Sequence, residues 1–179
     1  MQQAKAYLTT RKEEETAYIG ELLGLIINRP LVVALDGELG TGKTVFVHGA
    51  ATGLGVAEEQ VASPTFVLLK IYHGRLPVYH FDFYRLTADD DYLELGFEEY
   101  LPGDGVAFIE WAGRMPWLLP PEFLHVGFER FDDEQGEGRR IWFVPFGTYA
   151  SETLEALLGA VTWRTDGSLY RQQPRDIIL

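Results

Sequence analysis

Cysteine is absent from this sequence, and lysine and asparagine are scarce. The 179 residues include no Cys, four Lys and one Asn. Without cysteine there is no disulfide and no thiolate metal site, so neither a disulfide-stabilised secreted fold nor a zinc finger is indicated. No apolar run approaches the roughly 20 residues of a membrane-spanning helix, and the first residues lack the pattern of a signal peptide. We therefore expect a cytoplasmic protein with no membrane partner.

Positive charge is also in short supply. Fifteen Lys plus Arg stand against 27 Asp plus Glu, for a formal net charge of -12. An acidic surface repels the phosphates of nucleic acid, so direct, tight binding of nucleic acid is not expected. Two explanations of the acidity stay open, namely a well-solvated surface and docking on a basic protein partner.

One glycine-rich segment carries most of the chemical information. It reads Gly37-Glu38-Leu39-Gly40-Thr41-Gly42-Lys43-Thr44 and fits the pattern G-x-x-x-x-G-K-[ST]. A β-branched apolar run at 31–35 precedes it, as expected of a buried strand, and residues 44–51 can continue as a helix. Glycines let backbone N–H groups converge on phosphate oxygens, and the helix dipole favours negative charge there. The segment predicts a nucleotide phosphate site, with Lys43 at the β- and γ-phosphates and the Thr44 hydroxyl on Mg²⁺.

The expected nucleotide is ATP rather than GTP. Guanine is commonly read by an Asn/Thr-Lys-x-Asp motif. The single asparagine, Asn28, is not followed by lysine, and none of the four lysines follows a threonine. Adenine is therefore the default base.

The remaining pattern predicts one α/β domain over residues 1–160, followed by a tail at 161–179. We expect a P-loop NTPase-like central sheet flanked by helices, with antiparallel strands and hairpins added. The tail is expected to be poorly ordered or to pack on a neighbour. The predicted elements are a helix at 11–27 capped by Thr9 or Thr10, a hairpin at 66–72 and 77–83, a buried strand at 105–110, a second hairpin at 124–131 and 140–146, and a helix at 151–160 capped by Ser151.

Hydrolysis of ATP needs a further acidic group that holds the magnesium shell or orients water, usually at the end of a strand beside the loop. Asp82 and Glu110 both end apolar runs of the right kind. Along the run to Asp82, alternation places the odd-numbered aromatic residues in the core and leaves His80 and Asp82 to line a cleft. Each acid can instead be an ordinary strand-end carboxylate, and His80 can be purely structural.

Two more features have open explanations. Ser63-Pro64-Thr65 follows the loop-helix unit, where P-loop proteins often carry a nucleotide-sensing segment, but the same residues can simply start a strand. Trp111 is next to Glu110, so its indole can contact the nucleotide site or pack in the core.

Together these motifs resemble the TsaE family, also called YjeE, the small bacterial P-loop ATPases of tRNA threonylcarbamoyladenosine (t6A) synthesis. The resemblance extends over about residues 9 to 146, and the end beyond about Ala160 is longer than usual. Its carriers are Gly37 to Thr44, Ser63-Pro64-Thr65-Phe66, His80-Phe81-Asp82-Phe83-Tyr84-Arg85-Leu86, Gly96-Phe97-Glu98-Glu99-Tyr100 and Ile109-Glu110-Trp111.

The resemblance implies residue roles at the phosphate end of the site. Thr44 and Glu110 would be the magnesium-side ligands, and Asp82 would be catalytic or position the water. The implied ATP-binding residues are Thr10, Glu38, Leu39, Gly40, Thr41, Gly42, Lys43 and Thr44.

Roles are also implied around the rest of the nucleotide. The Thr10 region would lie against the base, and Ser63 to Phe66 would act as a switch. Arg139 or Arg140 would complete the pocket.

The function implied is that of an Mg²⁺-dependent ATPase that assists tRNA modification without modifying tRNA itself. Such a protein acts on a complex of a TsaD-type transferase and a TsaB-type partner, and hydrolysis resets that complex. Slow turnover alone is expected, because no arginine finger can be assigned within the chain. The alternatives are a small-molecule P-loop kinase and a nucleotide-dependent binding module without hydrolysis.

Overall fold

A seven-stranded mixed sheet is the centre of the computed structural model, which describes residues 6–61, 68–86, 96–97, 100–101, 103–163 and 169–170. The strand order is β1-β7-β6-β2-β5-β4-β3. The strands are β1 (Ala6–Thr10), β2 (Leu31–Gly37), β3 (Leu69–His73), β4 (Pro77–Asp82), β5 (Val106–Glu110), β6 (Phe123–Asp133) and β7 (Gly136–Phe146).

The middle of the sheet is parallel and its two sides are antiparallel. β6, β2, β5 and β4 run parallel to one another, whereas β3 pairs antiparallel with β4, and β7 pairs antiparallel with β6 and β1. The carboxyl ends of the parallel strands consequently meet at one edge, where open α/β sheets bind their ligands. This mixed α/β sheet confirms the predicted fold class.

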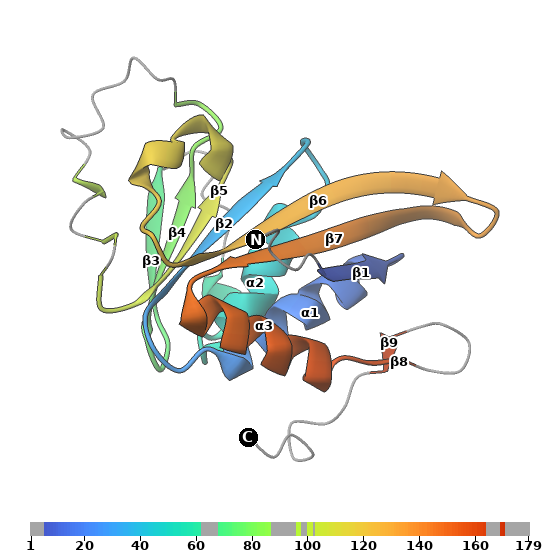
Figure 1. Ribbon diagram of the computed structural model, residues 1–179, viewed down its shortest axis with the longest axis horizontal. Helices are drawn as coiled ribbons and strands as arrows, with labels where there is room; N and C mark the ends of the chain where they lie inside the picture. The colour runs from blue at the N-terminus through green and yellow to red at the C-terminus, as the bar shows by residue number, and fades with distance from the viewer. Residues whose placement is uncertain are drawn as a thin grey trace.

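Three helices pack on one face of the sheet (Figure 1): α1 (Glu13–Ile26), α2 (Lys43–Gly53) and α3 (Thr148–Ala160). Alternation along β2 explains the two-sided core. Val33 and Leu35 join the cluster formed with the helices, whereas Val32 and Ala34 join a second cluster on the opposite face. The short helices η3 (Ala112–Arg114) and η4 (Pro116–Leu118) border that second cluster, which includes Ala112.

Helices α1 and α2 approach each other at glycine. A methyl group added at Gly20 would lie 2.1 Å from the carbonyl oxygen of Phe46, and one added at Gly49 would lie 1.9 Å from the carbonyl oxygen of Ala17. The same backbone-to-backbone approach recurs at Gly24. Helix α2, which begins at the end of the glycine loop, is therefore fixed directly by α1.

The first strand was not expected from the sequence. Residues 6–10 pair with β7, with Thr10 opposite Arg139, so Thr10 does not cap α1. The helix begins after Lys12, and the Glu15 carboxylate accepts hydrogen bonds from the backbone N–H groups of Arg11 (2.6 Å) and Lys12 (3.2 Å). A carboxylate at this helix end suits the unpaired N–H groups and the dipole.

Two other boundaries differ from the prediction. The hairpin of β6 and β7 continues through the polar segment that was expected to be a loop, and extends well past the neighbouring strands (Figure 1). Helix α3 begins after Gly147, and the Ser151 hydroxyl donates to the Gly147 carbonyl (2.8 Å) from within the first turn rather than capping the helix.

In the tail, β8 (Thr162–Trp163) pairs antiparallel with β9 (Leu169–Tyr170). Residues 164–168 and 171–179 of the tail lie outside the described residues, as do the expected switch Ser63 to Phe66 and most of the segment between Leu86 and Tyr100. No helix within the described part of the chain is both long and apolar enough to cross a membrane.

Candidate functional site

The glycine loop lies between the carboxyl end of β2 and the start of α2, as the sequence predicts. Gly40 and Gly42 have φ angles of 73° and 105°, which only glycine adopts without strain. α2 begins directly at Lys43. The loop therefore presents a helix N-terminus and its free N–H groups, the arrangement that suits a phosphate.

Lys43 arches back over this loop. Its ammonium donates to the carbonyl oxygens of Gly37 (2.7 Å) and Glu38 (2.8 Å), and lies 4.2 Å from the centre of the Trp111 ring. Burial lowers the pKa of Lys43, and the charges of nearby carboxylates, Glu110 first among them, oppose that shift. A buried cation whose described neighbours include neutral carbonyls and an aromatic face is well placed to bind an anion.

Thr44 and Glu110 are in direct contact. The Thr44 hydroxyl lies 2.8 Å and 3.0 Å from the two oxygens of Glu110, so it donates to that carboxylate. Glu110 is the last residue of β5 and pairs with Leu35 of β2, which brings it beside the start of α2. The two residues implied as magnesium-side ligands, 66 positions apart in the chain, are thus brought together.

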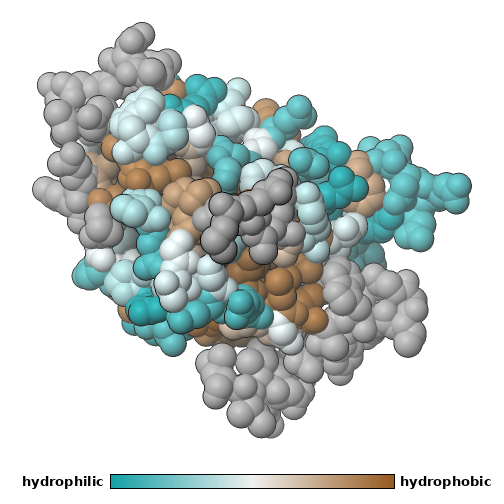
Figure 2. Space-filling model, in the orientation of Figure 1, coloured by the Kyte–Doolittle hydropathy of each residue, from teal (hydrophilic) through white to brown (hydrophobic). Residues whose placement is uncertain are grey.

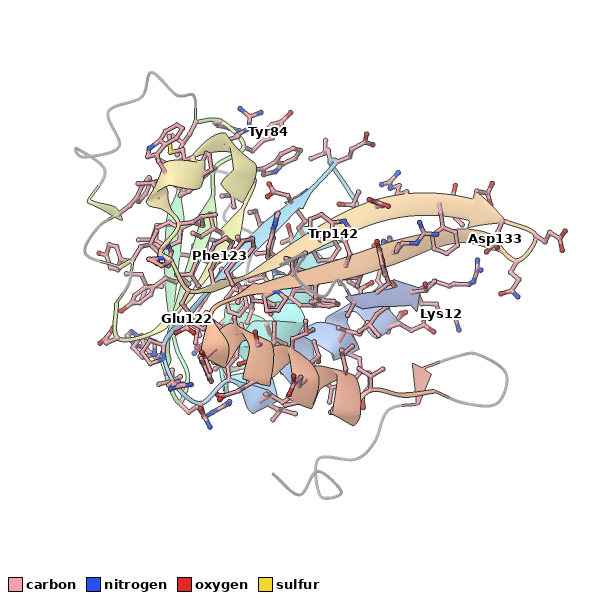
Figure 3. The ribbon with its side chains drawn as sticks, in the orientation of Figure 1. Lys12, Tyr84, Glu122, Phe123, Asp133 and Trp142 are labelled. Carbon is pink, nitrogen blue, oxygen red and sulfur yellow. The ribbon has the colours of Figure 1, made fainter. Side chains whose placement is uncertain are left out.

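Asp82 occupies the equivalent place on the next strand. It pairs with Glu110 across β4 and β5. Its carboxylate accepts a hydrogen bond from the backbone N–H of Tyr84 (2.9 Å) and is half-buried. Figure 3 shows Tyr84 at the edge of the sheet where the loop after β2 emerges. Two strand-end acids therefore lie side by side near the loop.

His80 does not line a cleft, contrary to the alternation-based expectation. The side chain is completely buried, with Nε2 2.9 Å from Glu110 Oε1. Val78, on the same face of β4, belongs to the helix-side core, so this face is buried and not open to a cleft. The position of His80 behind Glu110 was not predicted.

Trp111 is held in an unusual conformation beside the site. Its φ is 61°, a positive value that no other non-glycine residue in the described ranges adopts. Its backbone N–H donates to the Leu35 carbonyl (2.8 Å), and its ring lies 5.0 Å from that of Tyr84. A bulky residue in this region costs on the order of 1–3 kcal/mol and persists only where its surroundings impose it. The strain places the indole beneath Lys43, so Trp111 contributes to the site and not only to the core.

Sequence reasoning missed Asp36, the residue before the loop. Its carboxylate accepts from the backbone N–H of Gly113 (2.9 Å) and lies 2.9 Å from Nε2 of His125. Burial raises the pKa of Asp36, but the His125 and Gly113 hydrogen bonds and the charges of His125 and Lys43 bring it below its ordinary value. Asp36 ties the start of the loop to η3 and β6. Its position at the end of a buried strand was the available signal.

A cavity of about 550 Å³ lies between the distal part of the β6–β7 hairpin and the residues at the start of α1. Its lining consists of Arg11, Glu13, Arg130, Phe131, Asp132, Glu137, Gly138 and Arg139. The hairpin tip is hydrophilic (Figure 2), and Figure 3 shows Asp133 at the same end of the molecule as Lys12. Arg11, just before α1, connects that segment to the hairpin tip. Its guanidinium donates to the Asp133 carboxylate (2.7 Å) and to the Gly136 carbonyl (2.7 Å).

Two arginines that line this cavity, Arg130 and Arg139, also approach the glycine loop. Arg130 donates to the Gly40 carbonyl (2.7 Å), and a methyl group at Gly42 would lie 3.4 Å from the Arg139 side chain. Arg139 lines the cavity, whereas Arg140 lies toward Glu129 (3.8 Å). Thr10 is fully buried with its hydroxyl 2.8 Å from that of Thr16, so its neighbour Arg11, rather than Thr10 itself, lines the cavity.

The donor set suits Mg²⁺ carried in with a nucleotide. Nowhere in the described ranges do three histidine or carboxylate side chains converge as a self-sufficient metal centre. Mg²⁺ commonly takes only one or two protein ligands and completes its octahedron with phosphate oxygens and water. The Thr44 hydroxyl and the Glu110 carboxylate, already in contact, are ligands of the required kind.

A parallel-centred sheet with a glycine loop leading into a helix places this chain among the P-loop α/β proteins. Residues 10–141 match the family model of the threonylcarbamoyl adenosine biosynthesis protein TsaE. The chain belongs to this family.

Individual relatives agree with the family match. The TsaE protein of Treponema pallidum is 46% identical over 111 residues, which are 62% of this chain and 82% of the relative. That of Rickettsia felis is 36% identical over 167 residues, 93% of this chain and 95% of the relative. Each is described as a tRNA threonylcarbamoyladenosine biosynthesis protein. The crystal structure of Bacillus subtilis YdiB superposes with a TM-score of 0.73 at 33% identity, covering 89% of this chain and 97% of that one.

Proposed function

We propose that this protein binds ATP with Mg²⁺ at residues 37–44 and hydrolyses it, as a cytoplasmic accessory protein in tRNA threonylcarbamoyladenosine synthesis. The observation that carries the proposal is the contact of Thr44 with Glu110 beside Lys43, at a glycine loop in a TsaE family member. Relatives bear the name of this biosynthesis. The partners we propose are the TsaD-type transferase and its TsaB-type companion.

The loop would hold the triphosphate by charge and by backbone donors. Lys43 leaves the carbonyls of Gly37 and Glu38 and donates instead to phosphate oxygens, while N–H groups at the start of α2 bind the same oxygens. Thr44 and Glu110 would hold Mg²⁺, which would supply positive charge to offset that of the terminal phosphates. Charge stabilisation and positioning provide most of the catalysis in phosphoryl transfer.

Glu110 and Asp82 are assigned different roles in hydrolysis. Glu110 is engaged by Thr44 and lies deeper in the site, which suits the metal side. Asp82 is half-buried at the end of the adjacent strand, and from the described residues its carboxylate accepts one backbone hydrogen bond, so its remaining lone pairs can accept from a water. We assign Asp82 to orienting the attacking water.

The base and ribose would occupy the cavity between the distal hairpin and the start of α1. Phe131 provides an aromatic ring with the Arg11 guanidinium 5.2 Å from its centre, and Arg139 provides a cation beside Gly42. The volume of about 550 Å³ is sufficient for a nucleoside. The adenine preference comes from the absent guanine motif and stays part of the proposal.

Turnover would be slow until a partner is bound. Three arginines near the loop already have partners: Arg130 donates to the Gly40 carbonyl, Arg114 donates to the Leu86 carbonyl (3.0 Å), and Arg139 is paired with Glu13 (3.6 Å). An added arginine finger typically raises the rate of such sites about 10³-fold or more. The net charge of -12 suits docking on a basic protein surface.

The test is phosphate release from ATP, measured with and without a TsaD/TsaB-type pair. Asp82→Asn and Glu110→Gln should each reduce turnover by about 10²-fold while ATP binding weakens much less. Unchanged turnover in both variants would contradict the roles assigned to Asp82 and Glu110 in hydrolysis. A phosphorylated metabolite in place of free phosphate would favour a small-molecule kinase.

A pull-down with ATP, with ADP and without nucleotide tests the partners separately. Recovery of the TsaD/TsaB-type pair should depend on the nucleotide. Equal recovery in all three conditions would contradict a nucleotide-controlled accessory role.

A further inference from the structure

Behind the contact of Thr44 with Glu110 lies a histidine that the proposed mechanism does not use. His80 of β4 is completely buried, and the Glu110 side chain is only 5% exposed. The distance between His80 Nε2 and Glu110 Oε1 is 2.9 Å. Because an ionised carboxylate only accepts hydrogen bonds, Nε2 must carry the proton and donate it to Glu110.

The carboxylate is therefore held from two sides. Glu110 Oε1 accepts from the Thr44 hydroxyl in front and from the His80 ring behind. β4 and β5 are paired in register, with His80 opposite Phe108 and Asp82 opposite Glu110, so the backbones on which both side chains stand are fixed. A charge-assisted hydrogen bond between two buried side chains on such a support fixes the orientation of the carboxylate.

Among the described residues, Glu110 is the one group hydrogen-bonded to the His80 ring. His80 Nδ1 is buried without a partner in that part of the chain, and so is Nε2 of His48 on α2. Burial lowers the pKa of His48. Within the described part of the chain, the hydrogen bond to Glu110 is therefore the polar contact that sets the orientation of the buried His80 ring. This contact is the one to test.

We infer that His80 is a positioning residue: its Nε2–H holds the Glu110 carboxylate in the orientation that serves Thr44 and a magnesium ion. The inference rests on the proposed function of the same site. Partners that hold a metal-binding side chain in place typically change metal affinity by about 10- to 100-fold when they are removed. A purely structural buried histidine would instead affect stability and nucleotide binding alike, whether or not Mg²⁺ is present.

Two substitutions separate these roles. In His80→Gln the amide nitrogen can reach the place of Nε2, whereas in His80→Asn it reaches only that of Nδ1. Binding of a fluorescent ribose-labelled ATP analogue is titrated with Mg²⁺, and again in EDTA. His80→Asn should raise the Mg²⁺ concentration for half-maximal binding by about tenfold or more, while His80→Gln stays within about threefold of the original protein. Affinity in EDTA should be the same in all three, and kcat should fall in His80→Asn with KM for ATP nearly unchanged at saturating Mg²⁺.

The matched control is His73→Asn, at the exposed end of β3, which should leave every quantity unchanged. An unaltered Mg²⁺ dependence in His80→Asn, or equal weakening with and without Mg²⁺, overturns the inference. Failure of the unsubstituted protein to bind ATP overturns the proposed function instead.

A measurement on the unsubstituted protein does not depend on how the variants fold. Correlation of the ring nitrogens of His80 with their protons by NMR should place a proton on Nε2 in the nucleotide-bound state. A neutral ring protonated only on Nδ1 would contradict the inference.

Discussion

A single methyl group at Gly49 should weaken this fold more than most surface substitutions. Gly49 lies in α2, six residues after Lys43, where the helix touches α1. An added Cβ would lie 1.9 Å from the carbonyl oxygen of Ala17 and 2.7 Å from its carbonyl carbon. Ordinary contact begins near 3.4 Å, which leaves a deficit of about 1.5 Å. Both atoms belong to helix backbone, so no side-chain rotation relieves the clash.

Opposing terms set the size of the effect. Forcing extra atoms into a packed interior usually costs about 1–3 kcal/mol, and the high end applies because two backbones must separate. Glycine to alanine inside a helix gains about 1 kcal/mol through propensity. The net expectation for Gly49→Ala is a loss of about 2 kcal/mol in the free energy of unfolding.

Gly159→Ala is the matched control, because Gly159 lies in α3 and an added Cβ there meets nothing within 4 Å. We expect thermal unfolding of Gly49→Ala about 4–8 °C below that of the original protein. Gly159→Ala should unfold at an equal or slightly higher temperature, since only propensity acts there. Equal melting temperatures for the two variants would refute the close helix approach.

Three further substitutions test other parts of the structure. Arg75→Leu should cost about 2–3 kcal/mol in urea unfolding, because the guanidinium donates to carbonyls at the ends of α1 and α2, among them Gly53 (2.7 Å) and Leu25 (2.9 Å); a loss below about 0.5 kcal/mol would contradict this. Asp36 has a folded-state pKa below its ordinary value, so its contribution is present above about pH 4 and is lost as the pH falls further. Asp36→Asn should therefore show a shallower loss of melting temperature from about pH 5 to 3, and an unchanged slope would count against the His125 and Gly113 contacts. Phe131→Ala should weaken ATP and ADP alike by about tenfold and leave tripolyphosphate binding unchanged, whereas no effect on ATP would move the base out of the cavity.

Local patterns were sufficient to predict the central architecture. The apolar run before Gly37 and the helical segment after Lys43 predict β2 and α2, and the strand endings predict that Glu110 and Asp82 lie near the loop. These features depend on neighbouring residues and on the rule that parallel strands end at one edge. The observed sheet confirms them.

Non-local pairings could not be predicted in the same way. β1 is short, and its threonines favour a helix cap in isolation; it becomes a strand because β7, more than 120 residues later, pairs with it. The polar end of the β6–β7 hairpin is held together by backbone pairing. Such pairing does not require alternating apolar residues, so the sequence carries no signal for these strand ends. The contact of Asp36 with His125, 89 positions apart, depends on the parallel pairing of β2 and β6.

The sequence singled out Trp111 and His80, but it did not predict the backbone conformation of Trp111 or the contact of His80 with Glu110. A positive φ at tryptophan cannot be read from sequence, because it is imposed by surrounding contacts such as the hydrogen bond to the Leu35 carbonyl. For His80, alternation predicted the face but not what covers it. That face belongs to the helix-side core through Val78, and the buried His80 ring contacts Glu110 there.

Calorimetric titration with Mg²⁺ and ATP, comparing the original protein with Lys43→Ala, tests the central claim most directly. Within the described part of the chain, the Lys43 ammonium donates to two loop carbonyls and lies against Trp111, so its removal should leave the fold intact and abolish the binding heat. We predict one ATP bound per chain in the original protein and none in a folded Lys43→Ala. Equal ATP affinity in the two proteins would contradict a nucleotide site at this loop.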